Sequence, residues 1–292
     1  MEFIGEIKAI NTSDGIFNLA CINKDGETKN LKLDQNNKIT IGELYKFDYE
    51  VVEGERTSYH VKSFVRVLDL PFEEKNKHLR EYYKSAPLEC NDAKQEIDKY
   101  ISMLDNKIIK DITVYLINKY EEKFFLYPAA SKMHHAYIGG LAYHSIGMLH
   151  LADGIIENYP YLNKNYVYAG IMLHDIGKAI ELTGCVHTEY SLRGQLLGHL
   201  VLGALEIEDA AKALGYENTK ECLILCHMLV SHHGIPQYGA CKKPMTAEAL
   251  VLWYIDTIDS KFRVLGEVLE KTEPDSFTEP IGVLDRQKMY KC

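Results

Sequence analysis

The chain has 292 residues, of which 46% are hydrophobic and 26% are charged. This composition is typical of a globular protein with a sizeable core, and the length predicts one large domain or two ordinary ones. The formal net charge of −9 argues against charge-driven binding of nucleic acid over the whole surface, but it leaves room for a local basic groove or for positive charge from bound metal.

The sequence carries no targeting or membrane signal. Its longest apolar runs, such as ALVLWYI before Asp256, are far too short to cross a bilayer. The stretch MEFIGEIKAI lacks the basic and apolar segments of a signal peptide. The seven cysteines form no CxxC pair, and we interpret Cys222 and Cys226, one helical turn apart, as small buried residues. An odd number of thiols fits a reducing compartment, so we expect a cytoplasmic protein without membrane contact.

Residues 1–70 predict a small β-barrel. The stretch LYKFDYEVV alternates apolar and polar side chains at the period of a strand, and two Asp-Gly pairs are typical of hairpin turns. About five short strands in this length indicate a closed sheet, either OB-like or SH3-like. The aromatic residues here would stack on bases or fill the core, and we expect core positions for most of them: Phe17, Tyr45, Phe47, Tyr49 and Tyr59.

From about residue 72 the pattern changes to that of helices. Apolar residues recur at intervals of three and four from Lys94 to Tyr120, which predicts one long helix, and Pro128 interrupts the pattern. Further helices are expected near 138–158, 165–181, 194–214, 219–233 and 246–270.

Two residues are expected to mark helix ends: Gly234 as a helix stop and Thr246 as an N-cap. The segment after Pro274 is expected to pack loosely. We predict a barrel at 1–70, a helical linker region at 71–127 and an all-α domain at 128–292.

Seven side chains between residues 144 and 256 form an ordered set of candidate metal ligands: His144, His174, Asp175, His199, His232, His233 and Asp256. They fall on predicted helices or helix ends, where a polar side chain among apolar neighbours is costly unless it is paired, hydrogen-bonded or bound to metal. Imidazoles and carboxylates without a thiolate suit manganese, iron, zinc, cobalt or nickel. Such a set exceeds what one ion with open positions needs, so we expect two ions that share a bridging carboxylate.

Each of these assignments has a plainer alternative. Any one of the histidines taken alone would more often be a hydrogen-bonded core or surface residue, and only the ordered set favours metal. Asp259, one turn after Asp256, is an alternative ligand. Lys178 lies on the same helix face as Asp175 and is placed to reach a bound phosphate, or else it pairs with Glu181.

The order H…HD…H…HH…D, with the motif HDIGK intact, resembles the HD-domain metal-dependent phosphohydrolase superfamily. The resemblance implies that one ion binds His144, His174, Asp175 and Asp256. It implies that a second ion binds His199, His232 and His233, with Asp175 bridging the two ions.

A narrower resemblance is carried by KMHHAYIGGLAYHS, YAGIMLHDIGKAIELTG, LLGHL, SHHG and YIDTIDSK. Together these segments, within residues 128–265, resemble the YhaM-type 3′–5′ exoribonucleases, in which an OB-type domain precedes the HD domain. The resemblance implies an OB-like barrel followed by an all-α HD domain. It also implies a metal-dependent 3′–5′ exonuclease that hydrolyses phosphodiester bonds of single-stranded RNA, with single-stranded DNA as a further candidate substrate.

The same resemblance implies roles for individual residues. Asp175 and Lys178 would be catalytic, with Lys178 in contact with the substrate phosphate, as its place on the helix face also suggests. Arg193 departs from the resemblance, since a less basic residue is expected there in relatives, and it is a candidate for a substrate contact particular to this chain. His134 and His135 are weaker candidates for contact with the substrate and the leaving group. The expected cofactors are two divalent ions, manganese first, with iron, cobalt, nickel and zinc as alternatives. The expected partner is a single-stranded nucleic acid, and the sequence leaves a homo-oligomer open.

Two rival interpretations remain open at the level of sequence. One is a phosphohydrolase for free nucleotides or cyclic dinucleotides, with a regulatory barrel. The continuation HHGIPQYG lacks the HHE…GYP signature of cyclic-di-GMP hydrolases, which weighs against the cyclic substrate. The other is a non-catalytic nucleic-acid-binding regulator with structural metal, against which the full ligand set weighs.

Overall fold

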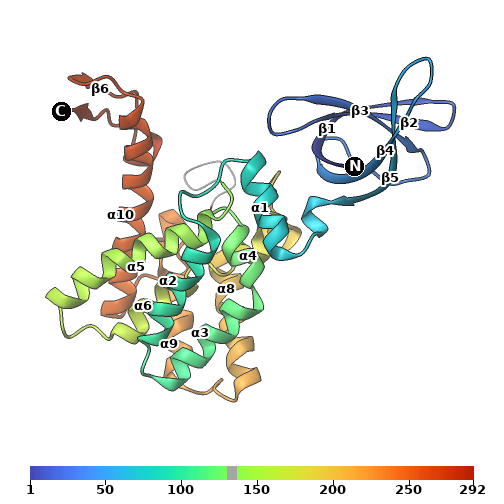
Figure 1. Cartoon of the computed structure of the whole chain (residues 1–292). Helices are drawn as coiled ribbons and strands as arrows, with labels where there is room; N and C mark the ends of the chain where they lie inside the picture. The colour runs from blue at the N-terminus through green and yellow to red at the C-terminus, as the bar shows by residue number, and fades with distance from the viewer. Residues whose placement is uncertain (130–136) are drawn as a thin grey trace. The chain divides into compact units, whose positions relative to one another are not determined.

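The computed structural model describes residues 1–129 and 137–292. The chain divides into two compact units, Met1–Lys84 and Ser85–Cys292. The first unit is a β-barrel with one α-helix, and the second is almost entirely helical (Figure 1). Within the described residues, no helix combines the length and the apolar character that are needed to span a bilayer.

The first unit contains five strands: β1 (Glu2–Ser13), β2 (Ile16–Ile22), β3 (Thr28–Asp34), β4 (Leu44–Val52) and β5 (Ser58–Arg66). They form a closed barrel in the order β1-β2-β3-β5-β4, because β4 pairs back to β1. Every pairing is antiparallel except that of β3 with β5, which is parallel. This mixed barrel, followed by helices, confirms the predicted fold class and is consistent with an OB fold.

Aromatic side chains fill the interior of the barrel. Phe47 is fully buried, and Tyr45 and Tyr49 are nearly so. Phe17 and Tyr59 are partly buried and pack against the same core. The prediction that most of these rings are core residues is confirmed, and their burial is a main source of the stability of the barrel.

One helix completes the first unit. Helix α1 (Phe72–Tyr82) follows a short 3₁₀ turn after β5. The hydroxyl of Tyr82 donates to the backbone oxygen of Ile4 at 2.6 Å, and Lys46 on β4 forms an ion pair with Glu74 at 2.8 Å. These contacts hold α1 against β1 and β4.

The second unit consists mainly of helices (Figure 1). They are α2 (Cys90–Ser102), α3 (Lys107–Lys119), α4 (Glu121–Leu126), α5 (Gly140–Asn158), α6 (Lys164–Leu173), α7 (Lys178–Glu181), α8 (Leu192–Leu214), α9 (Lys220–Ser231) and α10 (Ala247–Glu270). Short polar side chains accept backbone N–H groups at several helix starts, namely at Asn106, Asn163, Ser191, Thr219 and Thr246. The predicted N-cap at Thr246 is therefore confirmed.

The single helix predicted across 94–120 is wrong, because the structure has two helices there, α2 and α3. The backbone N–H groups of Asp105 and Asn106, between the two helices, donate to the side-chain oxygen of Asn165 at 2.9 and 3.0 Å. Asn165 lies on α6, far along the chain. The apolar periodicity continues through the break, so this tertiary contact could not be seen in the local pattern.

The segment after Pro274 is ordered against α10, and the expectation of loose packing is wrong. Strands β6 (Ser276–Phe277) and β7 (Tyr290–Lys291) pair with each other, and a 3₁₀ turn, η3 (Gly282–Leu284), lies between them. Ile281 is buried. The ammonium of Lys291 donates to the backbone oxygens of Leu269 and Thr272, at the end of α10, at 2.8 and 2.7 Å.

Helix α8 is kinked at Gly198, directly before His199. Gly198 has φ 69° and ψ 160°, a conformation that is essentially restricted to glycine. The helix therefore begins again at His199, and the kink sets the direction in which the His199 side chain leaves the backbone.

We expect Gly198→Ala to destabilise the helical unit by about 1–3 kcal/mol, because a side chain strains this backbone conformation. Gly266→Ala in α10 is the matched control. A Cβ at either glycine meets no atom within 4 Å, so both positions have room for a methyl group. They differ in backbone conformation, because only Gly198 has a positive φ. The control should be neutral or stabilising by about 0.5–1 kcal/mol, as expected for alanine in a helix. Urea unfolding followed through the fluorescence of Trp253 measures both, and equal effects would contradict the role of the kink.

Candidate metal centre

The helix predicted across 165–181 is broken, and the break places His174 and Asp175 in a turn between α6 and α7. The turn is tight, since the backbone N–H of Lys178 donates to the oxygen of Asp175 at 2.9 Å, an i→i+3 bond. Adjacent residues point about 100° apart on a helix. Both side chains nevertheless reach one site, because the site lies beside the turn.

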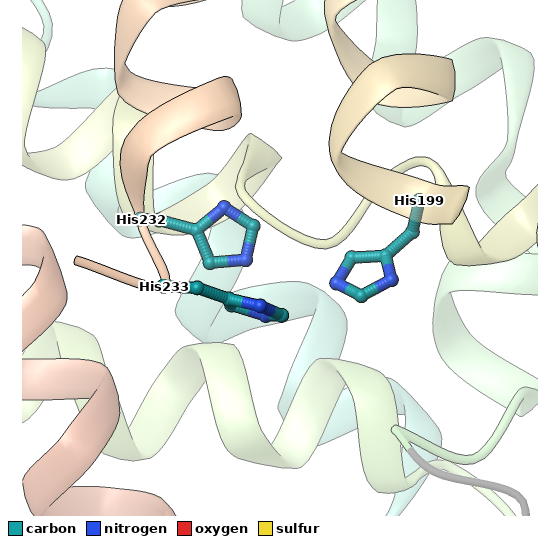
Figure 2. A group of neighbouring side chains, drawn as sticks. All are labelled: His199, His232 and His233. Atoms are coloured by element: carbon teal, nitrogen blue, oxygen red, sulfur yellow. The ribbon is translucent and has the colours of Figure 1, made fainter. Parts of the chain in front are cut away.

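Six side chains form two groups of potential ligands. The first group is His144, His174 and Asp256, and the second is His199, His232 and His233. Within each group the ligand atoms lie within 4.8 Å of one another. Figure 2 shows the rings of the second group, from α8 and from the end of α9, converging on one region. Apart from Asp175, which the resemblance also placed in the first set, these groups contain the residues that it assigned to two ions.

The carboxylate of Asp175 lies between the two groups. One oxygen, Oδ2, is 3.2 Å from Nε2 of His174 in the first group. The other, Oδ1, is 3.4 Å from Nε2 of His199 and 3.9 Å from Nε2 of His232 in the second group. Each oxygen therefore faces a different group, which is the geometry that a bridging carboxylate needs.

The Nδ1 atom of every histidine in the two groups has a hydrogen-bond acceptor. The acceptors are Ile171 O for His174, Leu229 O for His232, Tyr238 O for His233, Glu181 Oε1 for His199 and Asp259 Oδ2 for His144. A carbonyl or carboxylate oxygen accepts only if Nδ1 carries the proton. In a neutral ring the lone pair is then on Nε2, the atom that faces the site.

Three of these Nε2 atoms, in His174, His199 and His232, are buried and have no hydrogen-bond partner among the described residues. Leaving a buried acceptor unsatisfied costs about 1–3 kcal/mol, so three side by side are unusual. A divalent cation would satisfy them, because neutral imidazole nitrogen is a common metal ligand. The donor set therefore fits divalent metal.

The charge states of the site also suit a metal. Burial alone would raise the pKa of the Asp175 carboxyl, but Lys178 and His174 outweigh it and hold this pKa well below its usual range. Burial lowers the pKa of His232 and of His233, and each is lowered further by a neighbouring histidine. Asp175 is thus ionised and His232 and His233 are neutral, which are the forms that bind metal.

His144 lies between two carboxylates. Its Nε2 is 3.2 Å from Oδ1 of Asp256, and its Nδ1 is 2.8 Å from Oδ2 of Asp259. Burial lowers the pKa of His144, but these two acids outweigh it and raise the pKa to about 9. Asp259 also accepts from Arg263 at 3.3 Å. Asp259, weighed as an alternative ligand, thus contacts the far nitrogen of the ring, while Asp256 is on the side of the site.

Lys178 contacts the HD turn itself. Its ammonium donates to Oδ2 of Asp175 at 2.7 Å and to the backbone oxygen of Ala129. Burial lowers the pKa of Lys178, but Asp175 outweighs this effect and raises it, so the side chain stays charged. Glu181, the alternative partner, instead accepts from His199.

Glu181 is a functional residue that sequence reasoning missed. Its Oε1 accepts from the backbone N–H of His199 at 3.0 Å and is 3.1 Å from Nδ1 of the same residue. The first contact satisfies an N–H at the point where α8 begins again after its kink, and the second orients the ring. No local signal marks this pair, which lies eighteen residues apart.

Of the three weaker candidates, the structure describes only Arg193. Arg193 is exposed near the start of α8 and is absent from the residues that line the pocket described next. Its contact with substrate stays a prediction. His134 and His135 lie outside the described residues.

Members of both ligand groups line a pocket of about 750 Å³. Its lining includes His144, Asp175, Lys178, His199, His233 and Asp256. Four aromatic residues, Tyr190, Tyr238, Trp253 and Tyr254, line it as well. The C-terminal segment contributes Gly282, Val283 and Asp285. The pocket thus joins candidate ligands, one ammonium and aromatic surface in the size range of small-molecule sites.

A third cluster of potential ligands contains Glu208, Cys222 and Cys226. Burial raises the pKa of the Cys226 thiol, and its sulfur donates to the backbone oxygen of Ala204 at 3.5 Å. A thiol with a raised pKa is a poorer metal ligand than a ready thiolate. This cluster agrees with the interpretation of the two cysteines as packing residues.

Residues 141–261 match the family model described as HD domain, a range that contains both ligand groups and Asp175. Over 227 residues the chain is 44% identical to 3′-5′ exoribonuclease YhaM of Geobacillus sp. (strain WCH70), covering 78% of this chain and 70% of that protein. It is 43% identical over 214 residues to the YhaM of Shouchella clausii (strain KSM-K16), covering 73% and 67%. It is 40% identical over 219 residues to that of Bacillus subtilis (strain 168), covering 75% and 69%. An HD domain implies that the chain binds divalent metal.

We expect Glu181→Ala to weaken binding of the metal at the second group by about 10–100-fold, the usual cost of removing a partner that orients a ligand. Glu181→Gln keeps an oxygen acceptor for His199, so its metal affinity should fall by less. Isothermal titration with manganese measures both affinities and the number of ions. Glu270→Ala, at the exposed end of α10, is the control for loss of an acid. Unchanged manganese affinity in Glu181→Ala would contradict the role of this carboxylate.

Proposed function

This chain belongs to the YhaM family of HD-domain 3′–5′ exoribonucleases, and we propose that it removes nucleotides from the 3′ end of single-stranded RNA by hydrolysis. One observation carries the proposal: the two oxygens of the buried Asp175, which lines the pocket, face two separate groups of ligand atoms. A pair of ions at such groups is the arrangement that nucleases use for in-line displacement at phosphorus.

In this proposal Asp175 would be a ligand of both ions. His144, His174 and Asp256 would complete the first set of ligands, and His199, His232 and His233 the second. Imidazole and carboxylate donors without thiolate suit manganese first, and also iron, cobalt, nickel or zinc. When bound, the ions supply a nucleophile from water at neutral pH and stabilise the charge on the transferring phosphoryl group.

The residues of the chain prepare the site for this chemistry. The Nδ1 hydrogen bonds orient each imidazole with Nε2 toward the pocket. Asp259 and Glu181 are the acceptors for His144 and His199. His144, whose pKa is raised to about 9, would release its Nε2 proton when metal binds. The low pKa of Asp175 keeps both of its oxygens available.

Lys178 supplies a fixed positive charge at the wall of the pocket. An ammonium has three donors, and the contacts with Asp175 and Ala129 use two of them. Among the described residues no contact uses the third donor, which would bind a phosphate oxygen in this proposal. Because Lys178 is already held in place, a contact that strengthens as charge develops on the phosphate would contribute to the rate and not only to binding.

The experiment that tests the function uses single-stranded RNA labelled at its 5′ end, incubated with the purified protein and manganese. We expect a ladder of labelled products that shorten one nucleotide at a time from the 3′ end, and no products in the presence of a chelator. A labelled mononucleotide as the first product would mean the opposite polarity. Hydrolysis of free or cyclic nucleotides with no digestion of RNA would favour the rival phosphohydrolase.

Asp175→Asn should abolish hydrolysis and reduce the manganese content from two ions to one or none, while leaving the fold intact. The amide keeps the volume of the carboxylate but has only one oxygen to offer as a ligand. Metal content by mass spectrometry and circular dichroism accompany the RNA assay. More than a few per cent of wild-type turnover at saturating manganese would show that Asp175 does not bridge.

Lys178→Ala should retain both ions but lose about 10²–10³-fold in kcat, the scale seen when one electrostatic stabiliser of a transition state is removed. Lys178→Arg keeps the charge and should recover part of this loss. Single-turnover kinetics with metal analysis separates the possibilities. Loss of metal would mean that the ammonium mainly supports Asp175, and unchanged turnover would mean that it does not contact the phosphate.

A further inference from the structure

One face of α10 forms a wall of the pocket. The pocket-lining residues of this helix are Trp253, Tyr254, Asp256, Thr257, Ser260 and Lys261. With Trp253 as the first position, four of the others follow at intervals of three, four, seven and eight, which is one face of a helix. The face that carries the candidate ligand Asp256 therefore carries an aromatic residue one turn earlier.

Trp253 is held in a fixed position beside the second ligand group. A Cβ placed on Gly234 would lie only 1.9 Å from the indole ring, so the backbone of Gly234 lies directly against that ring. Gly234 immediately follows His232 and His233. Any movement of the indole is thus limited by the same short segment that carries two candidate ligands.

Tyr254 extends the aromatic surface from Trp253 toward solvent. The two rings are stacked, with centroids 5.0 Å apart and an angle of 23° between their planes. Tyr254 is 50% exposed although it lines the pocket. A ring that is stacked on one side and exposed by half still offers apolar surface to a planar group.

A second exposed ring is tied to the same ligands. Tyr238 is 63% exposed and lines the pocket, and its backbone oxygen accepts from Nδ1 of His233 at 2.7 Å. Exposed aromatic rings contribute little to folding stability, because they stay in water. Two of them beside a candidate metal ligand therefore indicate a surface for a ligand rather than a core.

We propose that Trp253, Tyr254 and Tyr238 form a stacking subsite that holds the 3′-terminal bases of a single strand while the neighbouring phosphodiester lies at the metal ligands. This subsite rests on the proposed exoribonuclease function. It would bind the terminal bases of the RNA substrate. Stacking accepts every base, since each has a planar face, so digestion should proceed with little dependence on sequence.

The first test uses the intrinsic fluorescence of Trp253, which is the sole tryptophan of the chain. Protein as purified is titrated with adenosine 5′-monophosphate and, separately, with ribose 5-phosphate, which has the phosphate and the sugar but no base. We expect saturable quenching by the nucleotide and none by ribose 5-phosphate at the same concentrations. Equal responses to both compounds, or none to the nucleotide, would overturn the subsite.

The second test couples a residue to a base. Two RNA strands are compared, one complete and one with abasic ribose at its last two positions, using the wild type and Tyr254→Leu. Loss of one stacking contact should raise KM by about tenfold. The variant should show this increase, mainly in KM rather than kcat, on the complete strand only. The abasic strand should give wild type and variant nearly the same KM.

Tyr161→Leu is the matched control, because Tyr161 is 74% exposed and is not among the pocket-lining residues. It should leave the KM of both strands unchanged. The subsite is wrong, and the exoribonuclease function stands, if the wild type digests the complete strand and one of two results follows for Tyr254→Leu. Either its KM equals that of the wild type, or its KM rises by the same factor on the complete and the abasic strand. If the wild type digests neither strand, the proposed function itself fails.

Discussion

The candidate site depends on one buried carboxylate. Asp175 is almost fully enclosed, and an isolated ionised carboxylate in such a place would be strongly disfavoured. Lys178, at 2.7 Å, and His174 together hold the pKa of this carboxyl well below its usual range. Among the described residues, the buried Nε2 atoms of His174, His199 and His232 have no hydrogen-bond partner, and they lie close to the same carboxylate. A divalent cation would satisfy these atoms, and the two oxygens of Asp175 define where it would lie. Because one side chain joins both ligand groups, a single tight turn sets their relative position.

The ends of two helices provide the orientation of key imidazoles without any additional residue. His174 follows α6 directly and His232 follows α9 directly, and each donates from Nδ1 to the backbone oxygen three residues earlier. Carbonyls in the last turn of a helix lack an N–H partner within the helix. The ring satisfies that carbonyl and in return is fixed in one tautomer. The break between α6 and α7 is thus useful as well as tolerated, since a continuous helix would have used these carbonyls for its own hydrogen bonds.

The barrel, most helices and the residues that gather at the candidate site could be predicted from sequence, because each rests on local pattern: alternation in strands, apolar intervals in helices, and polar residues where apolar ones are expected. The breaks could not. The gap between α2 and α3 depends on Asn165, and the acceptor for His199 is Glu181 on another helix. Lys178 shows the limit well. Its spacing allowed pairing with Glu181, but the tertiary contact of Glu181 with His199 and the position of Asp175 decide otherwise. Local spacing shows which residues can meet, and packing decides which do.

Aromatic residues are placed differently in the two units. In the barrel, the rings that could stack on bases are mostly interior. Lys29 lies 4.5 Å from the ring centroid of Tyr49 and donates to its hydroxyl at 2.7 Å. In the helical unit, the exposed rings of Tyr238 and Tyr254 line the same pocket as the candidate ligands. A pocket of about 750 Å³ is of the size that encloses a small ligand, not a long strand. If terminal bases are stacked in that pocket beside the ligands, a phosphodiester in the middle of a strand cannot be presented in the same way. Base stacking and exonuclease polarity would then have one structural cause.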